Sequence, residues 1–388
     1  MKTYTSYDRV KAALEHKEPD KIPFDLGSAA VTGININALR SLRKYIGLPE
    51  TVTLKDKVTQ IAHIEDDLID ALKIDIRGVV PDPALKKGLA YEPGIENGYD
   101  RLIDEWGMGW RMPVTGGHYY DLYHSPLASA TSIADIEKYP WPDALDMTRY
   151  SDLKLKADKF VYGEKKAYFL ERMSSGMWEH AMWMRGYEQF YIDMMVNPGI
   201  VQAIMERILE VNMQYWERAL AAVGENVLVA SMADDLGSQN SLLVDLETYR
   251  QQIWPFHKRL FDFVKSKAKG KIYIFFHNDG AVMETFPLLI DAGVDIINPF
   301  QVSCTGMDTR KFKLEFGRDL TVWGGSCDSQ VIMPFGTPQE VRDETRRRIE
   351  DLAPGGGFIF APIHVIQDGV PPENIMAWWE TLQKYGVY

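Results

Sequence analysis

The ten residues Lys271-Ile-Tyr-Ile-Phe-Phe-His-Asn-Asp-Gly280 decide the fold. The first six are rich in β-branched and aromatic side chains, which predicts a strand buried on both faces. Polar residues and a glycine follow directly, and an apolar helical pattern then covers residues 281–292. This order indicates the βα unit of a parallel sheet, a class in which chemistry collects at the carboxyl ends of the strands.

His277 and Asp279 lie two residues apart, so both side chains can face the same side where this strand ends. Such a pair is either a metal or acid–base pair, or a hydrogen-bonded pair that closes the top of the sheet. The spacing alone leaves both interpretations open.

Seven further segments show a strand pattern, and helical patterns separate most of them. Eight is the number of parallel strands that closes a (β/α)8 TIM barrel. The sequence therefore predicts an α/β TIM barrel as a single domain over residues 1–388, with a helical extension at residues 6–16. We expect the strands at residues 22–26, 74–80, 167–173, 226–233, 271–276, 294–299, 320–325 and 357–361.

Two segments between these strands have a distinct composition. Residues 56–72 predict a helix with an acidic solvated face. Residues from about 81 to 143 are rich in Gly, Pro and aromatic side chains and predict a long loop-like insertion. An insertion of this size is usually a lid or an oligomer arm. Its aromatic residues favour a homodimer.

Composition excludes several classes of protein. The hydrophobic share of 46% and the charged share of 25% are ordinary for a globular chain. A net charge of -12 without a long Lys/Arg run argues against nucleic acid as a partner. The absence of a long apolar run argues against a membrane segment. Only two cysteines, Cys304 and Cys327, and no signal core favour a soluble protein in a reducing cytoplasm.

Polar residues at the predicted strand ends should meet around the mouth of the barrel. Some of these side chains are expected only to cap or bridge strands. His277, Asp235, Asp279 and Cys327 are of types that bind metals such as zinc. The segment 174–195 is dense in Trp and Met, which indicates either a buried helix or an apolar substrate wall. The convergent set is Asp25, Arg77, Glu171, Arg172, Asp235, His277, Asp279, Asn298, Cys327 and His364.

A run of motifs is similar to the uroporphyrinogen decarboxylase superfamily, in the branch that contains corrinoid-dependent methyltransferases. The likeness extends over nearly the whole chain from EPDKIPFDLG onwards, and it implies a TIM barrel with its site at the carboxyl ends of the strands. The motifs are FFHNDGAV, GVDIINPFQVS, WGGSCDSQ, PFGTPQEVRDETRRRIEDLAPGGGFIFAP and HVIQDGVPPENI.

The departures from this resemblance narrow the function. True uroporphyrinogen decarboxylases carry an arginine-rich N-terminal motif, whereas PFDLGSAAVTGI here has no arginine before Arg40. Thiol-directed zinc methyltransferases of this branch carry His-x-Cys after strand five and a second Cys in an APGCG turn. This chain keeps His277 but has Asp279 and Gly356 at the two cysteine positions. The resemblance then implies an enzyme that demethylates a small donor, such as an aryl methyl ether, and methylates a cobalt(I) corrinoid protein.

This function needs an apolar pocket, an acid or electrophile for the leaving oxygen, and an opening for the corrinoid partner protein. We expect His277, Asp235 and Glu171 to be catalytic, and zinc to be held by His277, Asp279 and Cys327. Substrate binding is assigned to Arg77, Arg172, Trp178, His180, Asn298 and His364, with Glu179 and Arg185 as further groups reaching into the pocket.

Two other functions remain open from the sequence. A cofactor-free decarboxylase or lyase could act on a small carboxylic acid, with Arg77, Arg172 and Arg185 pairing its carboxylate. A non-catalytic binding barrel is the third alternative.

Overall fold

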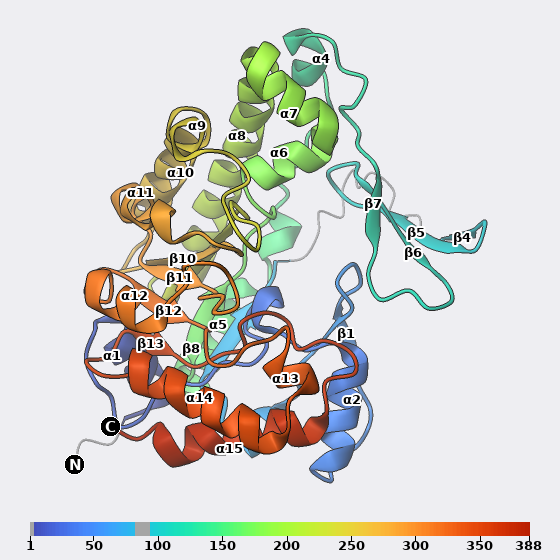
Figure 1. Cartoon of the computed structure of the whole chain (residues 1–388). Coiled ribbons are helices and arrows are strands. Elements are labelled where there is room, and N and C mark those ends of the chain that lie inside the picture. The colour runs from blue at the N-terminus through green and yellow to red at the C-terminus, as the bar shows by residue number, and fades with distance from the viewer. Residues whose placement is uncertain (1–3, 82–93) are drawn as a thin grey trace.

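A curved parallel sheet forms the centre of the molecule in the computed structural model, which describes residues 4–81 and 94–388 (Figure 1). Its seven strands follow the order β13-β12-β11-β10-β9-β8-β3, and every neighbouring pair is parallel. The strands are β3 (Ile76–Val79), β8 (Ala167–Leu170), β9 (Val229–Ala233), β10 (Tyr273–His277), β11 (Ile296–Asn298), β12 (Thr321–Trp323) and β13 (Phe358–Ile359).

The N-terminal segment at residues 22–26 closes the sheet between its two edges. Phe24 forms a parallel bridge with Phe360, and the Asp75 amide donates to the Phe24 carbonyl at 2.8 Å. The segment makes single bridges rather than a continuous strand, because Pro23 has no N–H to donate. Gly78 permits the close crossing, since a Cβ there would lie 1.5 Å from the carbonyl oxygen of Ser28. The predicted TIM barrel is confirmed.

Large side chains fill the interior of the barrel. Phe275 meets Phe169 and Trp323 edge-on, with ring centroids 5.0 and 5.5 Å apart. Val10 and Leu14 of α1 (Ser6–Leu14) belong to the same buried cluster. The barrel is therefore a packed core, as in other TIM barrels, and only its mouth is free for chemistry.

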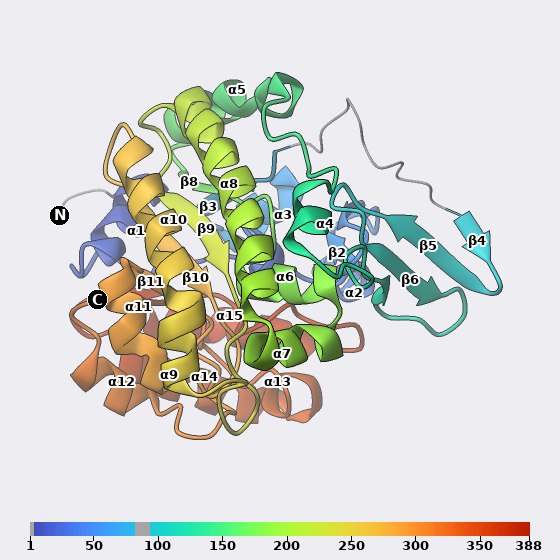
Figure 2. The ribbon, with the colours of Figure 1, turned by 90° about the horizontal axis from the view of Figure 1, so that it is seen from above.

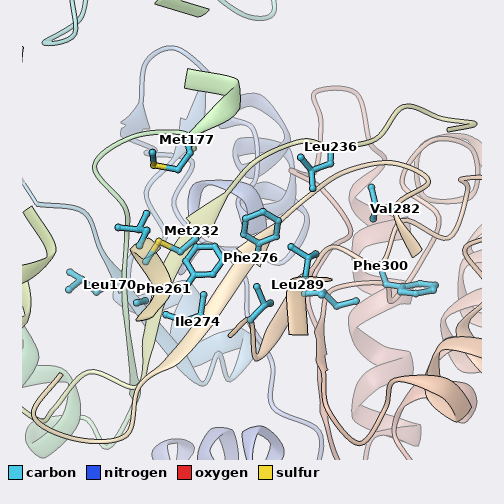
Figure 3. Close-up of a cluster of buried hydrophobic side chains, with 14 of the residues drawn as sticks. Leu170, Met177, Met232, Leu236, Phe261, Ile274, Phe276, Val282, Leu289 and Phe300 are labelled. Carbon is cyan, nitrogen blue, oxygen red and sulfur yellow. The ribbon is translucent and has the colours of Figure 1, made fainter. Parts of the chain in front are cut away.

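The outer face of β10 is buried as well, as the sequence predicts. Ile274 and Phe276 point away from the barrel axis toward Phe261 and Leu289, which belong to the covering helices (Figure 3). Phe261 and Phe276 meet edge-on with centroids 5.7 Å apart. Burial on both faces explains why this strand gave the clearest pattern in the chain.

Helices surround the sheet (Figure 2). The segment predicted as one helix at residues 174–195 is two helices, and α10 begins next to Pro255 after a π-helical turn, Tyr249–Ile253. The α-helices beyond α1 are α2 (Ile36–Tyr45), α3 (Asp66–Leu72), α4 (Ile133–Glu137), α5 (Leu153–Asp158), α6 (Trp178–Arg185), α7 (Tyr187–Val196), α8 (Pro198–Val223), α9 (Leu246–Thr248), α10 (Trp254–Lys267), α11 (Phe286–Ala292), α12 (Thr309–Glu315), α13 (Ile332–Phe335), α14 (Pro338–Leu352) and α15 (Pro372–Tyr385). No helix in the described part of the chain has the length and apolar character needed to cross a membrane.

The predicted helix at residues 56–72 is wrong over its first half. Residues 54–62 form a small antiparallel hairpin of β1 (Leu54–Asp56) and β2 (Ile61–Ala62), and α3 begins only at Asp66. The Asp56 carboxylate accepts from the Thr59 amide at 3.1 Å, and Gln60 has a left-handed φ of 57°. An Asp that binds the backbone three residues on favours a turn over a helix.

The insertion after β3 is more ordered than the loop that its composition predicts. It contains the four-stranded antiparallel sheet β4 (Gly94–Glu96), β5 (Tyr99–Ile103), β6 (Gly109–Pro113) and β7 (Asp121–His124), which projects from the side of the barrel (Figure 1). Residues 82–93 of the predicted insertion lie outside the described residues. Its role as a lid or as a homodimer arm stays a prediction.

Candidate active site

Strands β9, β10, β11 and β13 deliver polar side chains to the mouth of the barrel. His277 and Asn298 are the last residues of β10 and β11 and face each other in register. Ala233 at the end of β9 is opposite His277, so the following Asp235 comes to the same place. His364 follows β13 and approaches from the far side, its ring centroid 6.3 Å from that of His277.

Asn298 fixes the tautomer of His277. The Asn298 amide nitrogen donates to the Trp323 carbonyl at 2.7 Å, so its Oδ1 is the atom that faces His277 Nδ1, also at 2.7 Å. An oxygen acceptor at this distance requires the proton on Nδ1. The lone pair of Nε2 is then free and directed into the mouth of the barrel, as in histidines that bind metals.

A metal-type cluster surrounds this Nε2. Asp279 Oδ2 lies 3.6 Å from His277 Nε2 and 3.7 Å from His364 Nε2. One ligand atom from each of the three residues lies within 4.8 Å of the other two. Zinc bonds of 2.0–2.1 Å in a tetrahedron separate neighbouring ligands by about 3.3 Å. Asp279 Oδ1 is buried without a hydrogen-bond partner, so these residues fit a divalent metal.

The loop geometry holds Asp279 in position. Its amide donates to Asp235 Oδ1 at 3.0 Å, and the Gly280 amide donates to the Gln301 side chain at 2.8 Å. Gly280 has a φ of 104°, and a Cβ there would lie 2.5 Å from the Gly237 carbonyl carbon. A side chain at Gly280 would thus push apart the loops after β9 and β10, which carry Asp235 and Asp279.

Two carboxyl groups at the mouth favour their protonated forms. Burial, followed by the charges of Asp235 and Asp234, holds the pKa of Glu179 well above its usual value. Burial and the nearby Asp279 also raise the pKa of Asp235. Burial and neighbouring negative charges thus favour the neutral form of both carboxyl groups over the charged form.

Asp234 determines where Glu179 lies. Its carboxylate is fully buried and accepts from the amides of Met177, Trp178 and Glu179 at 2.8–3.0 Å. His257 Nε2 lies 2.6 Å from the same carboxylate. Asp234 thus anchors the start of α6 to the end of β9, and the side chain of Glu179 is directed toward Asp235 and Asp279.

A cavity of about 620 Å³ lies on the side of β3 and β8, and its lining does not include His277, Asp279 or His364. Arg172 lines it and donates to Ser231 Oγ on the inner face of β9 at 3.1 Å. The volume falls in the range of about 300–1,000 Å³ that small-molecule sites occupy. The mouth therefore holds a metal-type cluster and a carboxyl group of raised pKa, and the cavity next to Arg172 offers space for a small molecule.

Comparison with known proteins settles the ancestry of this barrel. The uroporphyrinogen decarboxylase (URO-D) family profile matches residues 127–385. The chain belongs to the uroporphyrinogen decarboxylase family.

Two curated relatives are similar to this family member. The methylated-thiol–coenzyme M methyltransferase of Methanosarcina mazei is 25% identical over 278 residues, which cover 71% of this chain and 65% of the relative. The alignment thus spans slightly less than two thirds of that protein's length. The uroporphyrinogen decarboxylase of Alkalilimnicola ehrlichii is 22% identical over 283 residues, 70% of each chain. Among solved structures, a methyltransferase from Methanosarcina mazei superposes with a TM-score of 0.65 over 99% of both chains at 15% identity, which confirms the fold.

In this uroporphyrinogen decarboxylase family member, the structure brings five of the predicted site residues together, and four others lie elsewhere. The five are His277, Asp235, Asp279, Asn298 and His364, and the four are Arg77, Cys327, Trp178 and His180. Arg77 lies on the outer face of β3, because its neighbour Ile76 fills the interior. Its guanidinium pairs with Asp66 at 2.5 Å and Glu164 at 2.8 Å, away from the His277 cluster. Arg77 therefore does not join the residues around His277, and its expected role in substrate binding stays a prediction.

Cys327 is the second correction. Its thiol is buried next to Thr345 of α14, and it lies outside the metal-type cluster of the described residues. Burial raises the pKa of this thiol far above its usual value. His364 takes the place in the cluster that the sequence analysis gave to Cys327.

Glu171 lies at the mouth, but its carboxylate already has partners within the protein. Its carboxylate accepts from the Ala30 amide at 2.7 Å and lies 3.5 Å from Lys55 Nζ. Lys55 also donates to the carbonyls of Gly27 and Ser28. This network connects the end of β8 to the N-terminal segment. The Glu171 carboxylate is held by these contacts.

Trp178 and His180 of α6 are enclosed rather than facing the cavity. Trp178 is fully buried, and the ring of His180 packs against Trp106 with centroids 4.2 Å apart. Neither ring nitrogen of His180 has a hydrogen-bond partner. Glu179, between them, is the residue that reaches the site. The sequence analysis named Glu179 only as one of several polar residues, on an aromatic-rich segment, that could reach into the pocket.

We expect an Asn298→Ala substitution to weaken zinc binding by about 10- to 100-fold, because the second partner of a metal-binding histidine sets its tautomer and orientation. Competition with a fluorescent zinc chelator measures the affinity. The exposed Asn240→Ala variant is the matched control. An unchanged affinity of Asn298→Ala would contradict the role given to this amide.

His180 predicts a pH-dependent stability. Burial lowers its pKa to about 3, so the unfolded chain takes up this proton as the pH falls below about 6.5 while the folded protein does not. Between pH 7 and 5 the wild-type protein should lose about 2 kcal/mol of unfolding free energy more than a His180→Phe variant. Urea denaturation at both pH values tests this, with the exposed His124→Gln variant as control. If wild type and His180→Phe lose equal amounts of unfolding free energy between pH 7 and 5, the prediction is refuted.

Proposed function

We propose that this protein is a methyltransferase that removes a methyl group from an aryl methyl ether and passes it to a cobalt(I) corrinoid carried by a partner protein. The cluster of His277, Asp279 and His364 at the barrel mouth carries the proposal. The His364 side chain is 43% exposed, so the cluster is open to a substrate and a partner. Similarity to a methylated-thiol–coenzyme M methyltransferase supports methyl transfer as the reaction class.

The ligand types favour an ether donor over a thiol. Thiolate ligands suit soft metal–sulfur chemistry, whereas imidazole and carboxylate make a metal a harder acid toward oxygen. His277, Asp279 and His364 would hold the zinc ion, which when bound supplies a Lewis acid for the ether oxygen. Asn298 keeps the Nε2 lone pair of His277 free for this purpose.

Glu179 supplies the proton that the reaction needs. As the bond between methyl carbon and oxygen breaks, its electron pair stays on the oxygen, and the cobalt(I) electron pair forms the new bond to carbon. The Glu179 carboxyl group, whose pKa is raised by burial and by the charges of Asp235 and Asp234, can give a proton to the leaving oxygen, which yields a neutral phenol. Arg172 lies near enough to stabilise the Glu179 carboxylate that remains, since its charge acts to lower the pKa of that group.

The experiment uses zinc-loaded protein, methoxybenzene-type donors and a reduced corrinoid acceptor. We expect methylcobalt absorbance and an equal amount of phenol, both dependent on the enzyme. Zinc-loaded protein that yields no methylcobalt with any aryl methyl ether would overturn the proposal.

A decarboxylase or lyase acting on a small carboxylic acid is the second candidate. It is favoured by Arg172, whose guanidinium has no carboxylate within ion-pair distance among the described residues. Carbon dioxide release without corrinoid would support this function over methyl transfer.

A further inference from the structure

We infer that Arg172 recognises a carboxylate on the methyl donor, so that the donor is an anionic aromatic ether rather than a neutral one. This inference rests on the proposed function and deepens it by naming the substrate class. Three observations carry it: the pairing of the cations around the cavity, the position of Arg172, and the character of the remaining walls.

The other cations that line the 620 Å³ cavity already have anionic partners. Among the described residues, Arg77 pairs with Asp66 and Glu164, Arg149 with Glu105, Lys156 with Asp152 and Lys55 with Glu171. Arg172 has only the neutral hydroxyl of Ser231. A half-buried guanidinium without an anion, in a chain of net charge -12, is a vacant site for a carboxylate.

The register of the sheet sets the distance from Arg172 to the metal-type cluster. Ser231, which holds the guanidinium, is opposite Phe275 on the inner face, and His277 lies two residues further along β10. Two residues of strand and one strand spacing amount to about 8 Å. A substituted benzene ring spans a gap of this order, with its carboxylate at Arg172 and its ether oxygen at the cluster.

Apolar side chains form part of the cavity wall, among charged and polar ones. They offer an apolar surface next to the Arg172 guanidinium, on which part of an aromatic ligand can pack. These lining residues are Leu26, Ile69, Ile76, Val79, Phe160 and Met173.

The test compares two ligands that differ in one group, 4-methoxybenzoate and methoxybenzene, by calorimetric titration of the full-length protein without corrinoid. Wild type should bind 4-methoxybenzoate roughly 10- to 100-fold more tightly, because a charge-assisted hydrogen bond contributes on that scale. Arg172→Gln should remove this preference and leave methoxybenzene binding unchanged. Arg172→Lys should restore part of it. The control is Arg259→Gln, an exposed arginine of α10 that pairs with Glu206.

Each outcome decides the inference. Equal affinities for the two ligands in wild type, or an equal loss for both in Arg172→Gln with unchanged thermal stability, would overturn it. A selective loss for 4-methoxybenzoate would support the carboxylate site even if methyl transfer fails, because binding is measured without turnover. Product analysis with 4-methoxybenzoate then separates the two uses of that site: 4-hydroxybenzoate plus methylcobalt marks demethylation and supports the inference, whereas carbon dioxide plus methoxybenzene marks decarboxylation and overturns its claim on a methyl donor.

Discussion

Replacing His277 by alanine is expected to lower methyl transfer by roughly 10³-fold and to remove most of the bound zinc. The residue contributes the best-defined atom of the cluster, an Nε2 whose lone pair is directed by the hydrogen bond from Nδ1 to Asn298. A Lewis acid stabilises the charge on a leaving oxygen by several kcal/mol, and about 4 kcal/mol corresponds to roughly 10³ in rate.

Two measurements distinguish this effect from a loss of folding. Metal analysis after dialysis reports the zinc content, and circular dichroism reports the fold. His124→Ala, an exposed histidine of β7, should keep both zinc and rate. If His277→Ala retains its zinc and its turnover, the assignment of the active centre fails.

A Glu179→Gln substitution is expected to lower kcat by roughly 10²- to 10³-fold, the usual contribution of a positioned acid. Glutamine keeps the shape of the side chain but carries no acidic proton. The start of α6 should persist, because Asp234 is bound by the backbone amide of Glu179 and not by its side chain.

The dependence on the leaving group identifies the role of Glu179. A donor whose phenol is strongly acidic, such as a nitro-substituted methoxybenzene, leaves without needing a proton, so the deficit of Glu179→Gln should shrink toward wild-type rates. Glu188→Gln on the exposed surface of α7 serves as the matched control. A deficit of constant size across all donors would show that Glu179 acts in another way.

The fold could be predicted because its strands carry strong local signals. β10 is buried on both faces and ends in a polar residue, so its type and the place of His277 at its carboxyl end followed from the pattern, although the strand covers Tyr273–His277 rather than the expected residues 271–276. Residues 54–62 carried a weaker signal. There the turn depends on a side-chain contact between Asp56 and the Thr59 amide, which hydrophobic periodicity does not register.

The site could be predicted only in part, because it depends on orientation as well as on position. Arg77 and Arg172 are both arginines near strand ends, yet Arg77 lies on the outer face of its strand and Arg172 reaches Ser231 inside the barrel. Residue types do not state which face of a strand points inward. The position of Glu179 could not be predicted from local sequence, because it depends on a tertiary contact. Asp234 anchors the first turn of the helix that carries Glu179.

The closing segment at residues 22–26 makes completion of this barrel a late event in protein synthesis. Phe24 has its bridge partner in Phe360, and Asp25 accepts from the indole of Trp323, 298 positions later. Until that part of the chain has been synthesised, these early residues can contact Asp75 but not Phe360 or Trp323, and the Phe24 ring is not yet covered. The last quarter of the chain thus completes both the closure of the barrel and, through His364, the metal-type cluster, so a truncated product would lack both.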